Sequence, residues 1–141
     1  MNNLNQLTVI VDADAIVAQV SITDSNYQKA GLISEKLKKF EARIVYPATA
    51  VTEAVTVLQK KQSSAIAYGT ANILIVGGVE IADVNYLTLL TAMNYFKPAG
   101  SKKNTLFDCI IMAVADRYET DIIFSFDKIY KKQGYRLVSD L

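Results

Sequence analysis

The sequence predicts an α/β protein, a three-layer α/β/α sandwich around a mainly parallel central sheet. Short runs of β-branched residues without polar alternation recur along the chain, as in strands covered on both faces. Amphipathic segments at helical spacing separate these runs, the alternation typical of α/β folds. The chain has 141 residues, of which 51% are hydrophobic, enough for one sizeable core. We therefore expect a single domain over residues 1–141.

The first half of the chain is predicted to hold two strands and three longer helices. The strands are predicted from β-branched runs, and the helices from apolar residues three or four positions apart. In order, these elements are a strand over 7–12, a helix over 25–40, a strand over 43–46 that Pro47 stops, a helix over 49–59, and a helix from Ser63 or Ser64 to about 76. Gly77 would take the C-terminal capping position of the last helix.

The second half repeats this alternation. The elements expected there are a short strand over 79–84, a helix from about 86 to 96 closed by Pro98, a loop over 99–104, a helix over 105–119, a strand over 122–126 and a last strand over 135–139. The sequence shows no internal repeat, linker or low-complexity tract.

Composition limits the chemistry that this chain can perform. It contains no histidine and a single cysteine, Cys109, so neither an imidazole triad nor a histidine or thiolate zinc site can be built. A bound metal would need oxygen ligands, which favours Mg²⁺ or Mn²⁺. The net charge of +1 creates no global field for nucleic acid, so any such binding requires a local patch.

The same composition bears on location. One cysteine excludes an internal disulfide and favours a reducing compartment. The N-terminal segment has no basic leader, and the longest uncharged stretch, 62–79, is interrupted by polar residues and by paired glycines. We therefore expect a cytoplasmic protein that does not enter the membrane.

Five acids stand apart from other charges, at the edges of segments that should be buried. They are Asp12, Asp14, Glu53, Asp108 and Asp127. Burying an ionised carboxylate without a partner costs on the order of several kcal/mol. Such residues are therefore seldom buried by accident. Ligands of parallel sheets bind beyond the carboxyl ends of strands, where the first and last of these acids are predicted to lie. A divalent cation would turn mutually repelling acids into mutually supporting ligands.

Each acid also has a simpler structural interpretation. Asp108 could complete a capping box with Thr105, and Glu53 could be a solvated residue of a first helical turn. Asp14 could cap the first helix, which we favour over direct ligation, and Asp127 could begin a turn. These interpretations are less persuasive when all the acids occur together.

Four segments, in their order and spacing, resemble the PIN-domain family, which includes the VapC-type toxins of toxin-antitoxin modules. The segments are VIVDADAIV, TEAVTVL, TLFDCIIMAVA and IIFSFDKIY, and the likeness spans nearly the whole chain. In that family one acid ends the first strand, a Glu lies on a middle helix, a third acid opens a late helix, and a fourth follows the next strand as Thr/Ser-x-Asp. Matched by position, these are Asp12, Glu53, Asp108 and Asp127, with Ser125 preceding the fourth.

Two departures from the family pattern stand out. Position 14, often Asn, Ser or Thr, is Asp here and could add a ligand. The segment after Asp127 reads Lys-Ile-Tyr, where an Arg-Asp-Phe-like sequence is common. Neither departure removes one of the four acids, although substrate preference could differ.

The resemblance implies a metal-dependent endoribonuclease. Asp12, Asp108 and Asp127 would hold one or two Mg²⁺ or Mn²⁺ ions, which acidify a water and stabilise charge on the scissile phosphate. Glu53 would complete the shell or orient the attacking water. Ser125 would bond a ligand carboxylate or the phosphate.

An acidic site also needs basic residues at its rim to hold RNA. Lysines on both sides of the predicted site could do this, and each could equally be an ordinary solvated charge; they are Lys102, Lys103, Lys128, Lys131 and Lys132, with Arg136 beyond them. Tyr130 and Tyr135, interleaved with the second group, could stack on unpaired bases or simply pack.

Two other functions remain possible at this stage. Asp12-Ala13-Asp14 also looks like the opening motif of haloacid-dehalogenase-type phosphatases, in which Asp12 would be the nucleophile, but Ile16 stands where Thr or Val is usual. Alternatively, the chain could be a catalytically inactive interaction module. The resemblance further implies an RNA substrate, an antitoxin protein partner and a homodimer.

Overall fold

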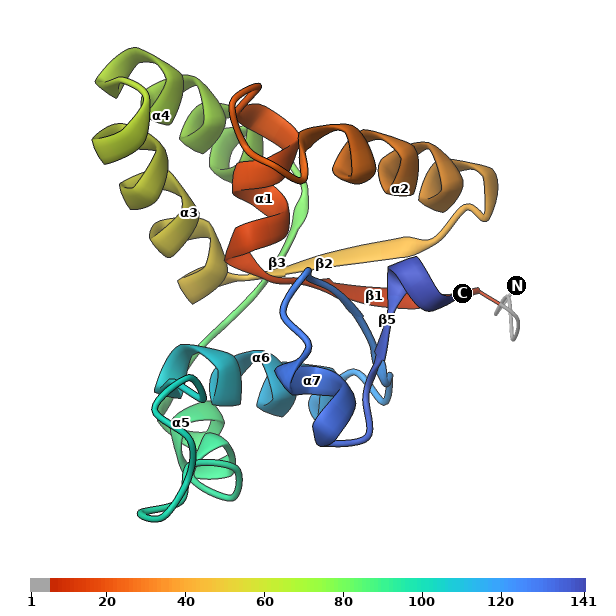
Figure 1. The fold of residues 1–141 in the computed structure, drawn as a ribbon, viewed down its shortest axis with the longest axis vertical. Helices are drawn as coiled ribbons and strands as arrows, with labels where there is room; N and C mark the ends of the chain where they lie inside the picture. Colours follow the sequence, from red (N-terminus) through yellow and green to blue (C-terminus); the bar gives the residue numbers. More distant parts are fainter. Residues whose placement is uncertain (1–5) are drawn as a thin grey trace.

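The computed structural model describes residues 6–141 and shows a five-stranded sheet between two layers of helices (Figure 1). The strand order is β3-β2-β1-β4-β5, and every neighbouring pair is parallel. The strands are β1 (Thr8–Val11), β2 (Arg43–Pro47), β3 (Glu80–Ala82), β4 (Ile122–Phe124) and β5 (Arg136–Leu137). The predicted fold class is confirmed, with a sheet that is wholly parallel over these strands.

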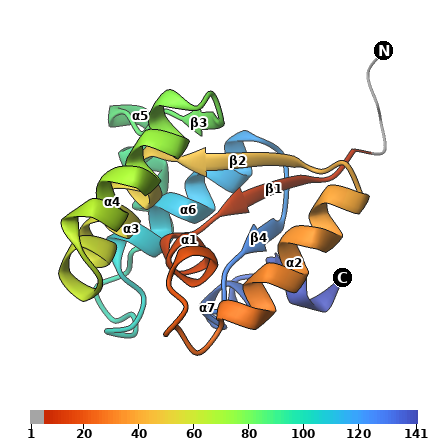
Figure 2. The same ribbon diagram turned by 90° about the horizontal axis from the view of Figure 1, so that it is seen from above.

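The helices divide into two groups that cover opposite faces of the sheet (Figure 1). One face carries α1 (Ala13–Val20), α2 (Tyr27–Lys39), α3 (Ala48–Lys61), α4 (Ser64–Ala71) and the π-helical turn η1 (Asn72–Val76). The other carries α5 (Tyr86–Ala92), α6 (Leu106–Arg117) and α7 (Ile129–Lys132), and the chain ends in the 3-10 turn η2 (Val138–Asp140). Viewed from above, α1 lies at the carboxyl end of β1, with α2 to one side and α3 and α4 to the other (Figure 2).

The centre of the sheet is where the direction of winding reverses. From β1 the chain moves outward through β2 to β3, then returns to add β4 and β5 on the other side of β1. The connections that leave β1 and β4 therefore lie on opposite faces. In such sheets the crevice beyond the carboxyl ends of the two strands is the expected ligand site.

The hydrophobic core is tightly packed around β1, the central strand at which the winding reverses. Val9, Ile10 and Val11 of β1 are fully buried, and α6 is buried over residues 109–115. A helix that is apolar on all sides requires cover on all sides, and α6 receives it from the sheet and from α5. Elements that carry candidate site residues are thus held on a rigid frame.

Several predicted bounds were wrong for physical reasons. The strand expected over 122–126 ends at Phe124, because the backbone N–H of Phe126 bonds a side chain instead of continuing the ladder. The helix expected to reach 96 ends at Ala92 and gives way to tight turns. The helix expected to reach 76 changes to a π-helical turn from Asn72, and Gly77 caps it as predicted. Neither α1 nor the short helix α7 was among the predicted helix ranges.

Within residues 6–141, no helix combines the length and the apolar character needed to cross a bilayer. The prediction that the N-terminal segment has no basic leader concerns residues 1–5 first of all, and these lie outside the described part of the chain. The single-domain assignment stays a prediction.

Candidate metal centre

Asp12 lies at the point where the sheet reverses. It follows β1 directly, is 7% exposed, and its backbone N–H donates to the carbonyl of Phe124 at 3.0 Å. Its side chain caps α1, since Oδ1 accepts from the N–H of Ala13 at 2.7 Å. The hydroxyl of Ser125, just beyond β4, lies 3.1 Å from Oδ2. Asp12 is therefore fixed by its own helix and by the residue that follows the neighbouring strand.

Tyr130 reaches the acids from the opposite face of the sheet. It lies on α7, is fully buried, and its hydroxyl donates to Asp12 Oδ2 at 2.7 Å. The same hydroxyl lies 3.3 Å from Asp108 Oδ1. Burial and the surrounding carboxylates raise the pKa of Tyr130 far above its ordinary value, so the hydroxyl keeps its proton. Because it has only one proton, the shorter contact identifies Asp12 as the main acceptor.

Asp108 serves the helix terminus and the acidic cluster with different oxygens. Its Oδ2 accepts from the N–H of Thr105 at 3.0 Å, while Thr105 Oγ1 accepts from the N–H of Asp108 at 3.4 Å. The predicted capping box is confirmed. Because Oδ1 faces Tyr130 instead, capping and a role in the cluster are compatible.

Asp14 does not cap the first helix, contrary to our prediction, because Asp12 occupies that position. Its Oδ2 accepts from the N–H of Phe126 at 2.9 Å and lies 3.1 Å from the hydroxyl of Ser125. Its Oδ1 is buried and has no hydrogen-bond partner among residues 6–141. A buried carboxylate oxygen without a donor is costly, and a cation would satisfy it.

Glu53 and Asp127 complete the cluster from two further elements. Glu53 lies in the second turn of α3, since that helix begins at Ala48, and it is half-buried. A solvated first-turn position was therefore the wrong alternative for it. Asp127 is exposed, and its Oδ1 accepts from the N–H of Ile129 at 3.0 Å, so the predicted turn role is confirmed. Its N–H donates to Ser125 Oγ at 3.0 Å, which ties it to the same loop.

The acids raise one another's pKa. Burial, then the charge of Asp14, raises the pKa of Asp12, and burial likewise raises that of Asp14. Burial together with the charges of Asp12 and Asp108 raises the pKa of Glu53 to about 7. Burial and the nearby Asp127 raise the pKa of Asp108. The carboxyl end of the sheet therefore concentrates negative charge, and among the described residues none of the five acids forms a salt bridge.

This cluster fits a hard divalent cation. Its donors are carboxylate and hydroxyl oxygens, one of them buried and unpartnered. Within residues 6–141, no three or more acidic, histidine or cysteine side chains are grouped closely enough to hold an ion by themselves as they stand. Mg²⁺ usually keeps several waters and takes only one or two carboxylates together with substrate phosphate, so the arrangement suits that mode of binding.

The predicted rim lysines do not all gather at the cluster. Lys103, Lys128 and Lys132 line a cavity of about 330 Å³ whose wall includes Asp127. Lys102 does not line it, and Lys131 instead pairs with Asp140 at 2.9 Å.

One basic residue was placed wrongly from the sequence, and for two tyrosines the structure decides between the alternatives. Arg136 does not lie near the acids, because it begins β5 at the amino-terminal end of the strands, whereas the acids lie at the carboxyl end. Its Nε and Nη2 donate to the two carboxylate oxygens of Asp121 at 2.8 and 2.9 Å. Tyr130 and Tyr135 are buried and cannot stack on bases. Tyr135 donates to Asp116 Oδ1 at 2.7 Å, so packing was the correct alternative for both tyrosines.

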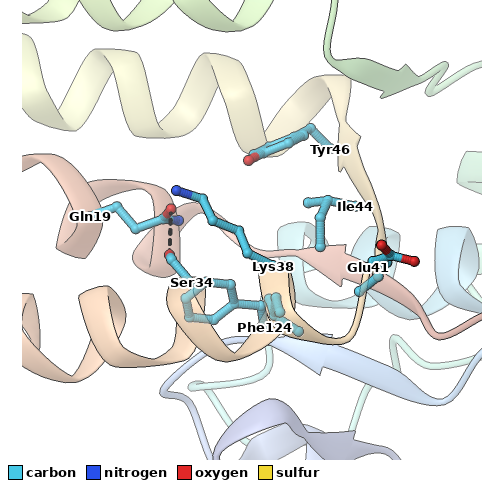
Figure 3. Close-up of a pocket in the computed structure, with 9 residues that line it drawn as sticks. Gln19, Ser34, Lys38, Glu41, Ile44, Tyr46 and Phe124 are labelled. Carbon is cyan, nitrogen blue, oxygen red and sulfur yellow. Dashed lines mark hydrogen bonds between the residues drawn. The ribbon is translucent and has the colours of Figure 1, made fainter.

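A second cavity, of about 200 Å³, lies between α1, α2 and the sheet and is separate from the acids (Figure 3). Gln19 and Ser34 bond each other across it, with 3.1 Å between Ser34 Oγ and Gln19 Oε1. Much of its remaining wall is apolar, including Ile44 and Phe124. None of the five clustered acids lines this cavity.

Fold and site together define a three-layer α/β protein with a cluster of acidic side chains at the carboxyl end of a parallel sheet. The model of the PIN domain family matches residues 9–134, and the chain belongs to that family. Among solved structures it resembles VapC20 of Mycobacterium tuberculosis, a sarcin-ricin loop cleaving toxin, with 16% identity and a TM-score of 0.78 over 91% of this chain and 96% of that one. No curated protein sequence matches the chain. The family match does not favour the phosphatase alternative.

Proposed function

We propose that this protein is a Mg²⁺- or Mn²⁺-dependent endoribonuclease that hydrolyses RNA phosphodiester bonds. The observation that carries the proposal is the convergence of Asp12, Asp14, Glu53, Asp108 and Asp127, from four separate segments, on the reversal point of the sheet. Family membership supports nuclease chemistry at that point. When bound, the ion would supply Lewis acidity to the scissile phosphate and a more acidic water.

The chain's own residues divide the remaining tasks. Asp12 and Asp108, joined through the hydroxyl of Tyr130, would hold the ion together with Asp127. Ser125 contacts both Asp12 and Asp14 and so orients ligand carboxylates rather than the phosphate. Asp14 would contribute its unpartnered oxygen as a further ligand.

Glu53 is suited to moving a proton. Burial and the charges of Asp12 and Asp108 raise its pKa to about 7 in the metal-free protein, and a bound cation would lower that pKa again and leave Glu53 as a carboxylate base. No described hydrogen bond restrains its side chain, so it can orient the attacking water and accept a proton from it.

The basic rim would position the substrate. Lys103, Lys128 and Lys132 stand beside Asp127 and would bind phosphates that flank the scissile bond. Lys102 and Lys131 lie outside the cavity and would not contact these phosphates, and Lys131 is paired with Asp140.

Partners follow from the likeness to a VapC toxin. We expect an antitoxin protein that holds the enzyme inactive, a homodimer, and a cytoplasmic location. Exposed apolar side chains on η1 and α5 support the presence of a protein interface; they include Ile73, Val76, Tyr86, Leu87 and Met93.

The test is incubation of the purified protein with single-stranded RNA and Mn²⁺, beside Asp12→Ala and the exposed control Asp83→Asn. Asp83 also follows a parallel strand but lies at the edge of the sheet. Cleavage by the wild type and by the control, but not by Asp12→Ala, supports the proposal. Equal cleavage by all three would reveal contamination or another site. Specific partner binding without any cleavage would support the inactive interaction module.

A further inference from the structure

A cavity of about 330 Å³ opens between two segments that are distant in the sequence. One wall is the loop between α5 and α6, over 95–104, and the other is the turn and short helix over 127–133. Its volume is at the lower end of the range of small-ligand sites, which is about 300–1,000 Å³. The cavity could therefore accept one small group rather than a duplex or a folded domain.

The lining concentrates positive charge in a chain whose net charge is only +1. Lys97, Lys103, Lys128 and Lys132 all line the cavity, and Asp127 is the only acid among its lining residues. Among the described residues, none of these four ammonium groups forms a salt bridge, whereas neighbouring Lys131 is paired with Asp140. Four cations around one hollow repel one another, so an anionic occupant would stabilise them.

Neutral polar groups lie between the lysines. Gln133 is exposed on the wall, and no described hydrogen bond engages its amide. Tyr95 is half-buried and also lines the hollow, and its hydroxyl donates to Asp116. Amide groups and aromatic rings are the partners that unpaired bases use, whereas a simple anion would need only the lysines.

The position of Asp127 separates a nucleic-acid occupant from an acidic peptide. This carboxylate lines the cavity and is also tied by its N–H to Ser125 of the acidic cluster. An occupant of the cavity therefore adjoins the place where a phosphodiester would be cleaved. A strand with regularly spaced phosphates can cross both places at once.

We propose that this cavity is a nucleotide subsite, which binds the base and phosphate of one unpaired ribonucleotide next to the scissile bond. The inference rests on the proposed function and adds to it the residues that would hold the nucleotide beside the cut. It also assigns a role to Lys97, Tyr95 and Gln133, which the sequence patterns did not mark.

The first test measures binding of a fluorescein-labelled single-stranded oligoribonucleotide by anisotropy, with the metal chelated. Each of Lys97→Gln, Lys103→Gln and Lys132→Gln should weaken binding and reduce the slope of log K against log salt by about 0.7. Lys131→Gln is the control, because it makes the same charge change on α7, next to Lys132 but outside the cavity. It should leave the slope unchanged. Equal losses in all four variants would overturn the subsite in favour of a diffuse field.

The second test uses the absence of tryptophan from the chain. Gln133→Trp places a fluorophore on the cavity wall, and exposed Gln59→Trp on α3 is the matched control. The oligoribonucleotide should quench the first variant by stacking and leave the second unchanged. Absence of quenching would overturn the base-binding role. Equally tight, lysine-dependent binding of a poly-glutamate peptide would reassign the cavity to an acidic protein partner.

These outcomes are independent of the cleavage assay. Mn²⁺-dependent cleavage with no effect of the cavity lysines on binding would leave the proposed function intact and remove the subsite. Lysine-dependent oligoribonucleotide binding without cleavage would support the cavity as a nucleotide-binding site and contradict the proposed function.

Discussion

The hydroxyl of Tyr130 donates to Asp12 Oδ2 at 2.7 Å, from a side chain that is fully buried on the opposite face of the sheet. It also lies 3.3 Å from Asp108 Oδ1. One phenol thus bridges two carboxylates, one directly after β1 and one in the first turn of α6, that lie 96 residues apart in the sequence. In the family pattern a Phe-like residue is common at this position, whereas this chain has a tyrosine.

Tyr130→Phe should weaken Mn²⁺ binding by on the order of tenfold, because groups that orient ligand carboxylates typically contribute this much. The ring is retained, so the fold should survive with a loss of about 1.5–3 kcal/mol for the missing hydrogen bond to a charged group. Calorimetric titration with Mn²⁺ and a urea melt measure the two effects separately. Unchanged or tighter Mn²⁺ binding in the variant would mean that the hydroxyl does not position the ligands.

Metal-free protein should lose stability as the pH rises from about 5 to 8. Burial and mutual repulsion raise the pKa of Asp12 to about 7 and that of Asp14 to about 6, above 3.8 in the unfolded chain. The native state therefore binds more protons than the unfolded state in this window, and the free energy of unfolding falls with increasing pH. Thermal melts in chelator test this trend. Saturating Mn²⁺ should reduce or reverse it, and rising stability in chelator would contradict the repulsion.

Glu53→Gln should stabilise the metal-free protein at about pH 8 and have little effect at about pH 5, where Glu53 is already protonated. The gain should be about 1 kcal/mol, since the half-exposed side chain is partly screened by solvent. Exposed Glu35→Gln on α2 serves as the control and should show no pH-dependent gain. A loss of stability at both pH values would show that Glu53 makes a structural contact instead.

Asp108→Asn and Thr105→Ala separate the two roles of the α6 terminus. The amide oxygen of Asn can still accept from the N–H of Thr105, so stability should be kept while Mn²⁺ affinity falls. Thr105→Ala removes the cap without altering charge and should cost about 1 kcal/mol while largely sparing Mn²⁺ affinity. Urea melts and Mn²⁺ titrations of both variants give the comparison. The reverse pattern would assign Asp108 to capping alone.

The sequence predicted the layers and the acids because both depend on local patterns. β-branched runs and helical spacing identify elements, and an isolated carboxylate in an apolar segment is conspicuous. The partners of those acids depend on long-range packing, which the sequence does not display. Tyr130 looked like a member of a basic surface segment, although the unpredicted helix α7 turns it inward to Asp12. Asp14 looked like a cap because nothing local revealed that the loop after β4 supplies its donors.

The most direct test of a single shared metal centre is Mn²⁺ titration of Asp12→Asn, Asp108→Asn and the double variant. If both carboxylates serve one ion, each single change should weaken binding strongly, and the double variant should lose far less than the sum of the two free-energy losses. The exposed control Asp83→Asn should bind as the wild type does. Fully additive losses, or Mn²⁺ binding that survives both changes, would contradict a shared centre.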